Sequence, residues 1–262
     1  MKKKGVDSAI IPAGGPSVRF GSPDKLKEKV GGKSVISHSM DLFDADPDCA
    51  VMIIAVSKPV REWIETNPLT FASPKMKLVE AGPSRAESVR NAVAAAATPV
   101  IVIQDASRPN AGEELLKRVL ATVKPDLGAA PARLLHDAVA GGTAKEQAGG
   151  KSAAADSFLG PKADFRIAAL GEHLKQGALY EIQTPQAYYR ESYLKAVEKA
   201  GGKLADFEDD SALYRSAGFN VALVAGRLGN LRIVTADDLH LLYKLMGSPQ
   251  QKKKDKYGGL GW

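Results

Sequence analysis

The sequence predicts an α/β protein of Rossmann-like type, with a mostly parallel sheet and helices on both of its faces. Short apolar runs recur along the 262 residues, and several are continuous rather than alternating, which is typical of strands that are covered on both faces. Segments with helical periodicity separate these runs. A chain of this length is ample for one large domain with a buried core.

The order of the segments supports this fold. The expected strands are residues 8–13, 50–56, 76–81, 99–104, 127–132, 220–226 and 231–235. The expected helices are residues 34–46, 84–97, 112–124, 209–218 and 235–246. Ser84 with Glu87 three residues later predicts a capping box, and Thr235 with Asp238 predicts a similar helix start. In such sheets, ligands bind at the carboxyl ends of the strands.

The pattern fails from about Leu134 to Gln183, which is rich in Gly, Ala and Lys and has little periodicity. Because this is long for a plain connection, we expect a protruding arm, a lid or a partly disordered insertion. Residues 6–247 are expected to form one domain that carries this insertion. Residues 1–5 and 248–262 are expected to be basic, flexible tails.

Composition excludes several classes of function. Lysines in the two tails account for the whole net charge of +6, so the body of the chain is neutral and offers no predicted nucleic-acid face. No apolar run approaches the roughly 20 residues that span a bilayer, and the start does not resemble a signal peptide, so we expect a cytoplasmic protein without membrane contact. The single cysteine, Cys49, excludes an intrachain disulfide, and the four histidines lack metal-ligand spacing.

The loop after the first expected strand is the clearest candidate for a binding site. Gly14 and Gly15 allow close approach of the backbone to a ligand, and exposed N–H groups there can hold phosphate oxygens. Arg19 and Lys25 add two cations, which suits a polyphosphate. The spacing matches neither a Walker A loop nor G-x-G-x-x-G, so a Rossmann oxidoreductase is excluded. A glycine turn with surface charges is the simpler alternative.

Six blocks of sequence together resemble a known family. They are "PAGGPSVRFG" with "DKL", "GPSRAESVRNAV", "IQDASRP", "QTPQAYY", "DDSALYRSAGF" and "GNLRIVTADDL". Their order and distances are similar to those of the 2-C-methyl-D-erythritol 4-phosphate cytidylyltransferases, which have a nucleotidyltransferase-type fold, and ribitol-5-phosphate cytidylyltransferase is a near relative. The resemblance covers about residues 8–246, apart from the long middle segment.

The resemblance implies an enzyme that transfers CMP from CTP to a polyol phosphate with the help of Mg²⁺. It implies that Arg19 and Lys25 are catalytic and stabilise the charge on the phosphates. The implied nucleotide contacts are Ala13, Gly14, Gly15, Gly82, Ser88, Asp105 and Ala106. Asp105 is also the implied Mg²⁺ ligand, since a carboxylate suits a hard cation. The alternatives are a cap for Asp105 and a surface salt bridge for Arg108.

The acceptor half departs from the family pattern. Arg108, Lys175, Gln176 and Arg232 are the implied acceptor contacts, but Gln176 and Ala138 stand where the family has an arginine and a threonine. The acceptor is therefore either methylerythritol phosphate, or another polyol or sugar phosphate such as ribitol 5-phosphate. A nucleotide-binding homologue with reduced activity is the third alternative. The resemblance also implies a homodimer through the arm.

Overall fold

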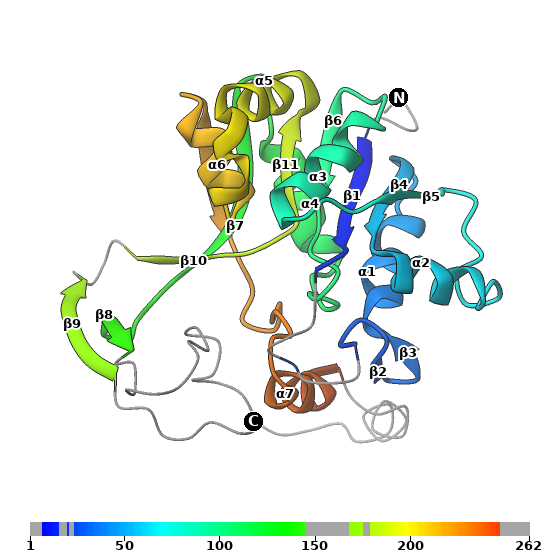
Figure 1. Cartoon of the computed structure of the whole chain (residues 1–262), viewed down its shortest axis with the longest axis horizontal. Helices are drawn as coiled ribbons and strands as arrows, with labels where there is room; N and C mark the ends of the chain where they lie inside the picture. Colours follow the sequence, from blue (N-terminus) through cyan, green and yellow to red (C-terminus); the bar gives the residue numbers. More distant parts are fainter. Residues whose placement is uncertain (1–6, 16–19, 21–23, 145–167, 175–178, 247–262) are drawn as a thin grey trace, which may run out of the picture.

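The computed structural model describes residues 7–15, 20, 24–144, 168–174 and 179–246, which form a layered α/β domain (Figure 1). Eight strands make the central sheet, in the order β10-β7-β11-β6-β1-β4-β5, with β12 paired to β7. Their bounds are β1 Asp7–Ala13, β4 Cys49–Val56, β5 Met76–Glu80, β6 Val100–Ile103, β7 Leu127–Leu134, β10 Tyr180–Ile182, β11 Gln186–Tyr189 and β12 Asn220–Ala225.

Most neighbouring strands run parallel. Strands β6, β1, β4 and β5 are parallel to one another, as are β12 and β7. Strand β11 runs antiparallel to both β6 and β7, and so joins the two parallel groups. The prediction of a mostly parallel sheet is confirmed. Because β1, β4, β5 and β6 share one direction, their carboxyl ends lie at the same edge.

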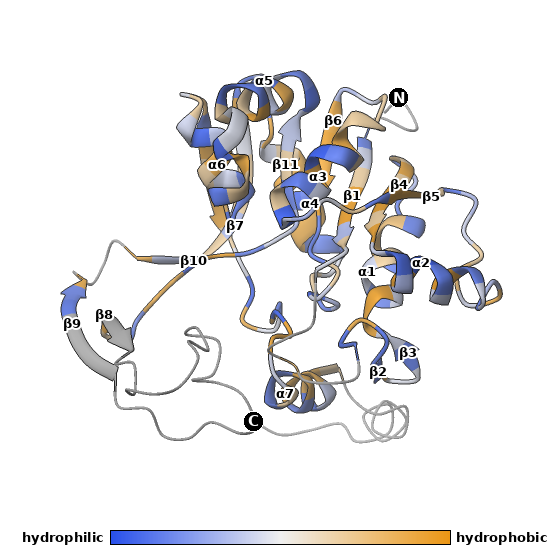
Figure 2. Cartoon of the chain, viewed as in Figure 1, coloured by the Kyte–Doolittle hydropathy of each residue, from blue (hydrophilic) through white to orange (hydrophobic). Residues whose placement is uncertain are grey.

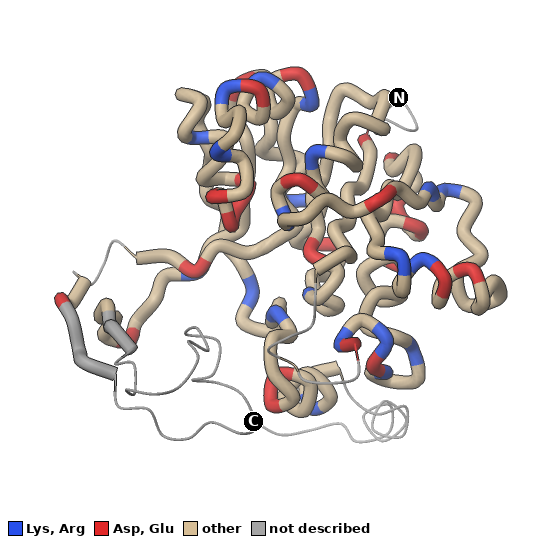
Figure 3. Tube along the Cα trace, viewed as in Figure 1, with Lys and Arg blue, Asp and Glu red and all other residues tan. Residues whose placement is uncertain are grey.

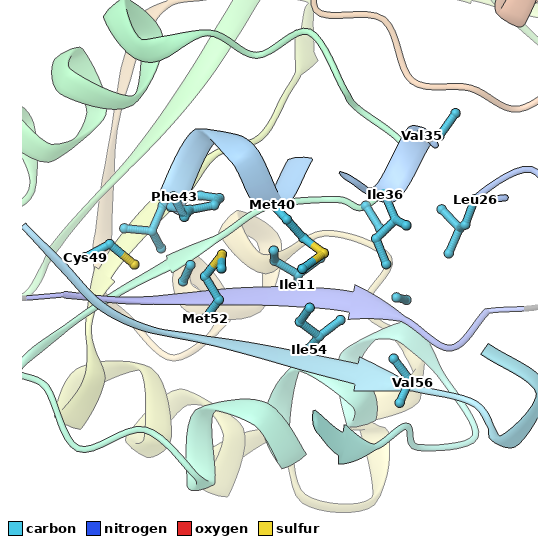
Figure 4. Close-up of a cluster of buried hydrophobic side chains, with 14 of the residues drawn as sticks. Ile11, Leu26, Val35, Ile36, Met40, Phe43, Cys49, Met52, Ile54 and Val56 are labelled. Carbon is cyan, nitrogen blue, oxygen red and sulfur yellow. The ribbon is translucent and has the colours of Figure 1, made fainter. Parts of the chain in front are cut away.

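Helices cover both faces of the sheet, as predicted. Helices α1 (Val35–Asp44) and α4 (Glu113–Thr122) contribute to one buried cluster, shown in part in Figure 4. Helices α3 (Arg85–Ala94), α5 (Arg190–Ala200) and α6 (Asp210–Ser216) contribute to the other. Figure 2 shows hydrophobic residues gathered along the central strands, between the two layers of helices.

Five further elements belong to the main body. Helix α2 (Lys58–Glu65) buries Val60 and Ile64 in the same cluster as α1, and the 3-10 helix η2 spans Gly201–Asp206. The hairpin of β2 (Lys29–Val30) and β3 (Lys33–Ser34) lies beside the last helix, α7 (Ala236–Met246). The Tyr243 hydroxyl of α7 donates to the Lys29 carbonyl of the hairpin.

One expectation for the secondary structure is wrong, and one pair of strands was not predicted. Residues 231–235 do not form a strand, although the N–H of Ile233 donates to the Ser107 carbonyl at 2.9 Å. In the segment without periodicity, β8 (Val139–Ala144) and β9 (Ala168–Leu174) pair in a separate antiparallel sheet, which projects from the body in Figure 1. The role of residues 134–183 as an arm and the bounds of the domain and tails remain predictions.

Candidate active site

The loops after β1 and β5 meet at the carboxyl edge of the sheet. Strand β1 ends at the buried Ala13, and a Cβ atom added to Gly14 would lie only 2.1 Å from the Cβ of Ala81, just beyond β5. Since real Cβ atoms do not approach so closely, a glycine at residue 14 allows the two loops to touch. Gly15 is exposed, with nothing within 4 Å of such an added atom.

Gly82 and Ser88 form a tight turn at the start of α3. The Gly82 N–H donates to the Ser88 hydroxyl oxygen at 3.0 Å, and the Ser88 hydroxyl lies 2.8 Å from the Ser84 carbonyl. A Cβ atom on Gly82 would lie 2.5 Å from the Cβ of Glu87. Ser84 caps the helix and forms the predicted capping box with Glu87, which is confirmed. The buried Ser88 hydroxyl therefore contacts both the N–H and the carbonyl of Gly82 and shapes this turn.

Asp105 lies two residues beyond β6, among three guanidinium groups. Its Oδ1 accepts hydrogen bonds from Nε and Nη2 of Arg85 at 3.0 and 2.9 Å. Its Oδ2 lies 3.7 Å from the Nε atoms of both Arg108 and Arg232. Burial alone would raise the pKa of this carboxyl, but the charges of Arg85, Arg232 and Arg108 hold it well below its usual range. Asp105 is therefore ionised at neutral pH.

The two candidate arginines near Asp105 differ in how far they are engaged. Arg108 is buried and donates from Nη1 to the Asn230 carbonyl at 2.8 Å. It therefore does not form the surface salt bridge that was the alternative interpretation of this residue. Burial lowers the pKa of Arg108, while Asp105 opposes that shift. The side chain of Arg232 is 42% exposed, and its closest described contact is the long one to Asp105. Arg232 is thus the more open of the two.

The remaining candidates are only partly placed. Ala106 is buried, and its carbonyl accepts a hydrogen bond from the Ser39 hydroxyl of α1 at 3.2 Å. Lys25 lies in the turn between β1 and β2. Arg19, Lys175 and Gln176 lie outside the described residues.

Three residues that contact Asp105 or its partner were not predicted from the sequence, namely Arg85, Asp210 and Thr184. Arg85 also pairs with Asp210 at the start of α6, with Nη1 to Oδ2 at 2.7 Å. The Thr184 hydroxyl oxygen accepts from the N–H of Asp105 at 3.0 Å. Each of these residues stands inside a block of the resemblance, so the blocks were a signal, but nothing in them indicates mutual contact.

A cavity of about 1130 Å³ lies between α1 and α4. Arg108 lines it, whereas the described residues Gly14, Gly82 and Asp105 do not. Its wall is largely apolar, with Leu42 and Leu116 among the residues that line it. The cavity therefore reaches the loop after β6 through Arg108 but does not include Gly14, Gly82 or Asp105.

Two features are absent from the part of the chain that the structure describes. None of the helices in the described ranges is long and apolar enough to cross a membrane. The same residues contain no group of three or more His, Cys, Asp or Glu placed to hold a metal ion. Figure 3 shows basic and acidic residues interspersed along the described chain.

Comparison with known proteins gives consistent results. The model of the family "IspD: 2-C-methyl-D-erythritol 4-phosphate cytidylyltransferase" matches residues 8–152 and 166–247. The 2-C-methyl-D-erythritol 4-phosphate cytidylyltransferase of Cereibacter sphaeroides (strain ATCC 17023) is 31% identical over 243 residues, which cover 91% of this chain and 96% of that protein. The bifunctional enzyme IspD/IspF of Anaeromyxobacter dehalogenans is 31% identical over 240 residues, 92% of this chain, but this chain spans only 57% of its length.

Solved structures agree on the fold. The 2-C-methyl-D-erythritol 4-phosphate cytidylyltransferase from Thermus thermophilus has a TM-score of 0.67 and 24% identity, covering 91% of this chain and 97% of that one. The Francisella tularensis enzyme of the same name has a TM-score of 0.70 and 20% identity, covering 90% and 97%.

The sheet, with helices on both of its faces, has the nucleotidyltransferase-like α/β fold of these solved structures. The family model matches nearly the whole length described, on both sides of the segment around residues 153–165. The chain belongs to the 2-C-methyl-D-erythritol 4-phosphate cytidylyltransferase family. The predicted resemblance and the predicted enzyme class are confirmed.

Proposed function

We propose that the chain transfers CMP from CTP to 2-C-methyl-D-erythritol 4-phosphate and releases pyrophosphate, in non-mevalonate isoprenoid biosynthesis. The observation that carries this proposal is the family match over residues 8–152 and 166–247, which includes both the nucleotide half and the acceptor half. The arrangement of the carboxyl edge supports it. We further propose that the protein is cytoplasmic and forms a homodimer in which residues 134–183 make the contact between subunits.

In the reaction, a phosphate oxygen of the acceptor attacks the α-phosphorus of CTP. The bond from that phosphorus to the bridging oxygen of the β-phosphate breaks, and pyrophosphate leaves. Because phosphoryl-type transfer needs little covalent help, the chain contributes positioning and charge neutralisation. Gly14 and Gly15 would approach the phosphates, Gly82 and Ser88 would contact the cytosine, and Arg19 with Lys25 would neutralise the developing charge.

A bound Mg²⁺ would neutralise phosphate charge, and the chain offers one ligand that fits it. Mg²⁺ is commonly held by one or two carboxylates together with substrate phosphates and water. Asp105 is ionised, and its Oδ1 accepts short hydrogen bonds from Arg85. The guanidinium nitrogens nearest to its Oδ2 lie 3.7 Å away, which is longer than a hydrogen bond. Oδ2 of Asp105 is therefore the oxygen that would hold the ion.

The acceptor phosphate brings nearly two negative charges, so its pocket needs cations or N–H donors. Arg232 is the open cation near Asp105, while Arg108 already donates to the Asn230 carbonyl. Lys175 and Gln176 are the proposed further contacts. Because neither Gln176 nor Ala138 carries charge, a different polyol phosphate, such as ribitol 5-phosphate, is the second candidate acceptor.

The test is turnover with defined substrates. The purified chain is incubated with CTP, Mg²⁺ and either 2-C-methyl-D-erythritol 4-phosphate or ribitol 5-phosphate, and pyrophosphate release and product mass are measured. We expect the first acceptor to be used and ATP not to replace CTP. Turnover with ribitol 5-phosphate alone would move the assignment to the second candidate, and no cytidylylated product with either acceptor would contradict the proposal.

A pair of variants tests the mechanism in the same assay. Lys25→Ala should lower turnover by about 10²–10³-fold, by analogy with the removal of one preorganised charge at a transition state. Arg61→Gln is the control, because it removes a cation from the exposed ion pair with Glu65 on α2, 3.6 Å long. Wild-type turnover in Lys25→Ala would exclude this lysine from the reaction.

A further inference from the structure

One arginine links three segments that lie far apart in the sequence. Arg85, the first residue of α3, gives two N–H groups to Oδ1 of Asp105, at 3.0 and 2.9 Å. Its remaining terminal nitrogen, Nη1, lies 2.7 Å from Oδ2 of Asp210 on α6. The start of α3, the loop after β6 and the start of α6 are thereby tied through a single guanidinium group.

The ion pair between Arg85 and Asp210 is largely buried. The side chain of Asp210 is 1% exposed and that of Arg85 is 20% exposed. The other oxygen of Asp210 accepts a hydrogen bond from the Tyr193 hydroxyl at 2.6 Å. Burial raises the pKa of Asp210 and Arg85 opposes that shift, so removing the arginine would leave a buried carboxylate without its counter-charge.

The geometry separates the roles of the two oxygens of Asp105. Arg85 holds Oδ1 through short, directed bonds from two nitrogens, as a guanidinium fork does when it grips a carboxylate. Arg108 and Arg232 approach Oδ2 only to 3.7 Å. The fork therefore fixes the rotation of the carboxylate, and with it the direction in which Oδ2 points.

We propose that Arg85 is a positioning residue for the reaction, which orients the Asp105 carboxylate, and that Asp210 anchors Arg85 for this task. The inference rests on the proposed function, because it takes Asp105 to be the group that meets Mg²⁺ and CTP. Arg85 itself need not touch either substrate. A purely structural ion pair between Arg85 and Asp210 is the competing explanation.

Four variants distinguish the two explanations. Arg85→Gln removes the fork, Asp210→Asn removes the anchor's charge, and the double variant removes both charges together. Arg85→Lys keeps the charge without the fork. Arg61→Gln on α2 is the matched control, since it removes an arginine from an exposed pair. Each is measured for melting temperature, for kcat and KM across pH, and for affinity for CTP with Mg²⁺ by calorimetry.

We expect Arg85→Gln to lower kcat/KM by about 10–100-fold, as the loss of an outer partner of a metal-binding group does. Its affinity for CTP with Mg²⁺ should fall in calorimetry, because the Asp105 carboxylate is no longer held in one orientation. The double variant should regain thermal stability but neither turnover nor the original affinity for CTP with Mg²⁺. Arg85→Lys should keep most of the thermal stability while turnover stays low, because lysine supplies the charge without the fork. The control should match wild type.

Recovery of turnover together with stability in the double variant would overturn the proposal, since it would leave only the structural pair. Turnover of Arg85→Gln within about twofold of wild type would do the same. The carboxyl-carbon NMR chemical shift of Asp105 in the free protein at neutral pH, assigned with Asp105→Asn and compared between wild type and Arg85→Gln, needs no substrate. This measurement tests the effect of Arg85 on Asp105 even if the wild-type chain turns over neither acceptor. Absence of turnover in the wild-type chain would count against the proposed function and not against the role of Arg85.

Discussion

Replacing Asp7 by asparagine should make the stability of this protein less dependent on pH. Asp7 is the first residue of β1, is 2% exposed, and its Oδ1 has no hydrogen-bond partner among the described residues. Burial, with the neighbouring charges of Asp46 and Asp48, raises the pKa of Asp7 from its ordinary 3.8 to about 7. The folded protein therefore binds a proton here that the unfolded chain releases.

The size of the effect follows from this shift. Between the ordinary pKa and the raised one, the folded state holds more protons than the unfolded state, so stability falls as the pH rises through that window. At about 1.36 kcal/mol for each pKa unit, wild-type protein loses up to about 4 kcal/mol of unfolding free energy by about pH 8. Asparagine cannot ionise, so the Asp7→Asn variant should lose none of it.

The assay is urea unfolding of wild type and variant at about pH 5 and about pH 8. The variant should be the more stable protein at the higher pH, and the gap should narrow at the lower pH. Asp237→Asn, on the exposed face of α7, controls for the loss of one negative charge. If the difference between Asp7→Asn and wild type is the same at both pH values, the carboxyl of Asp7 does not titrate in this window and the reasoning fails.

Three further changes have definite expected results. Ser84→Ala should lower the unfolding free energy by about 1 kcal/mol in urea, because the capping box with Glu87 is lost; an unchanged midpoint would contradict this role. Gly82→Ala should cost about 1–3 kcal/mol and weaken CTP binding in calorimetry, because its Cβ atom would lie 2.5 Å from that of Glu87; wild-type values for both would show that the turn adapts. Burial, followed by the charge of Asp7, raises the pKa of the Cys49 thiol to about 12, so a thiol reagent should label it only as the protein unfolds, and rapid labelling of native protein would refute this.

The strands of the core were predictable because both of their faces are buried. Ile53 and Ile54 are adjacent in β4, point to opposite faces, and are each fully buried in a different cluster. A strand in that position must be apolar at every residue, and the sequence shows this as a continuous run. The confirmed capping box at Ser84 was predictable for a similar reason, since it needs residues only three apart.

The wrong strand at residues 231–235 and the unpredicted strands β8 and β9 have the opposite cause. Residues 231–235 alternate like a strand, but Ile233 is the buried residue among them and no neighbouring strand within the described ranges pairs with it. Strands β8 and β9 pair with each other in a separate two-stranded sheet, so no apolar run marks them. In both places the outcome depends on which backbone lies alongside, which local residue types do not encode.

For the candidate site, too, the sequence indicated residues within single motifs but not the contacts between distant segments. The motifs indicated Gly82, Asp105 and Arg108 because each stands at the end of a predicted strand or in the loop that follows it. Arg85 was missed because its own segment reads only as a helix start. Its contacts with Asp105 and Asp210 exist because the order of the strands and the packing of α3 against the sheet bring three distant loops together.

The guanidinium groups around Asp105 differ in what a bound phosphate would change. Arg85 makes short hydrogen bonds to Asp105 and a 2.7 Å ion pair with Asp210, so both carboxylates restrain it. Arg232 is 42% exposed and lies 3.7 Å from Oδ2 of Asp105, so exchanging this contact for a short, charge-assisted bond to a phosphate oxygen would be favourable. When phosphate draws Arg232 away, Oδ2 would lose a positive neighbour while Oδ1 stays gripped by Arg85. Binding of the acceptor phosphate to Arg232 would thus free Oδ2 of Asp105 to accept the proposed metal ion, which would couple the binding of the acceptor to the binding of Mg²⁺ at this edge of the sheet.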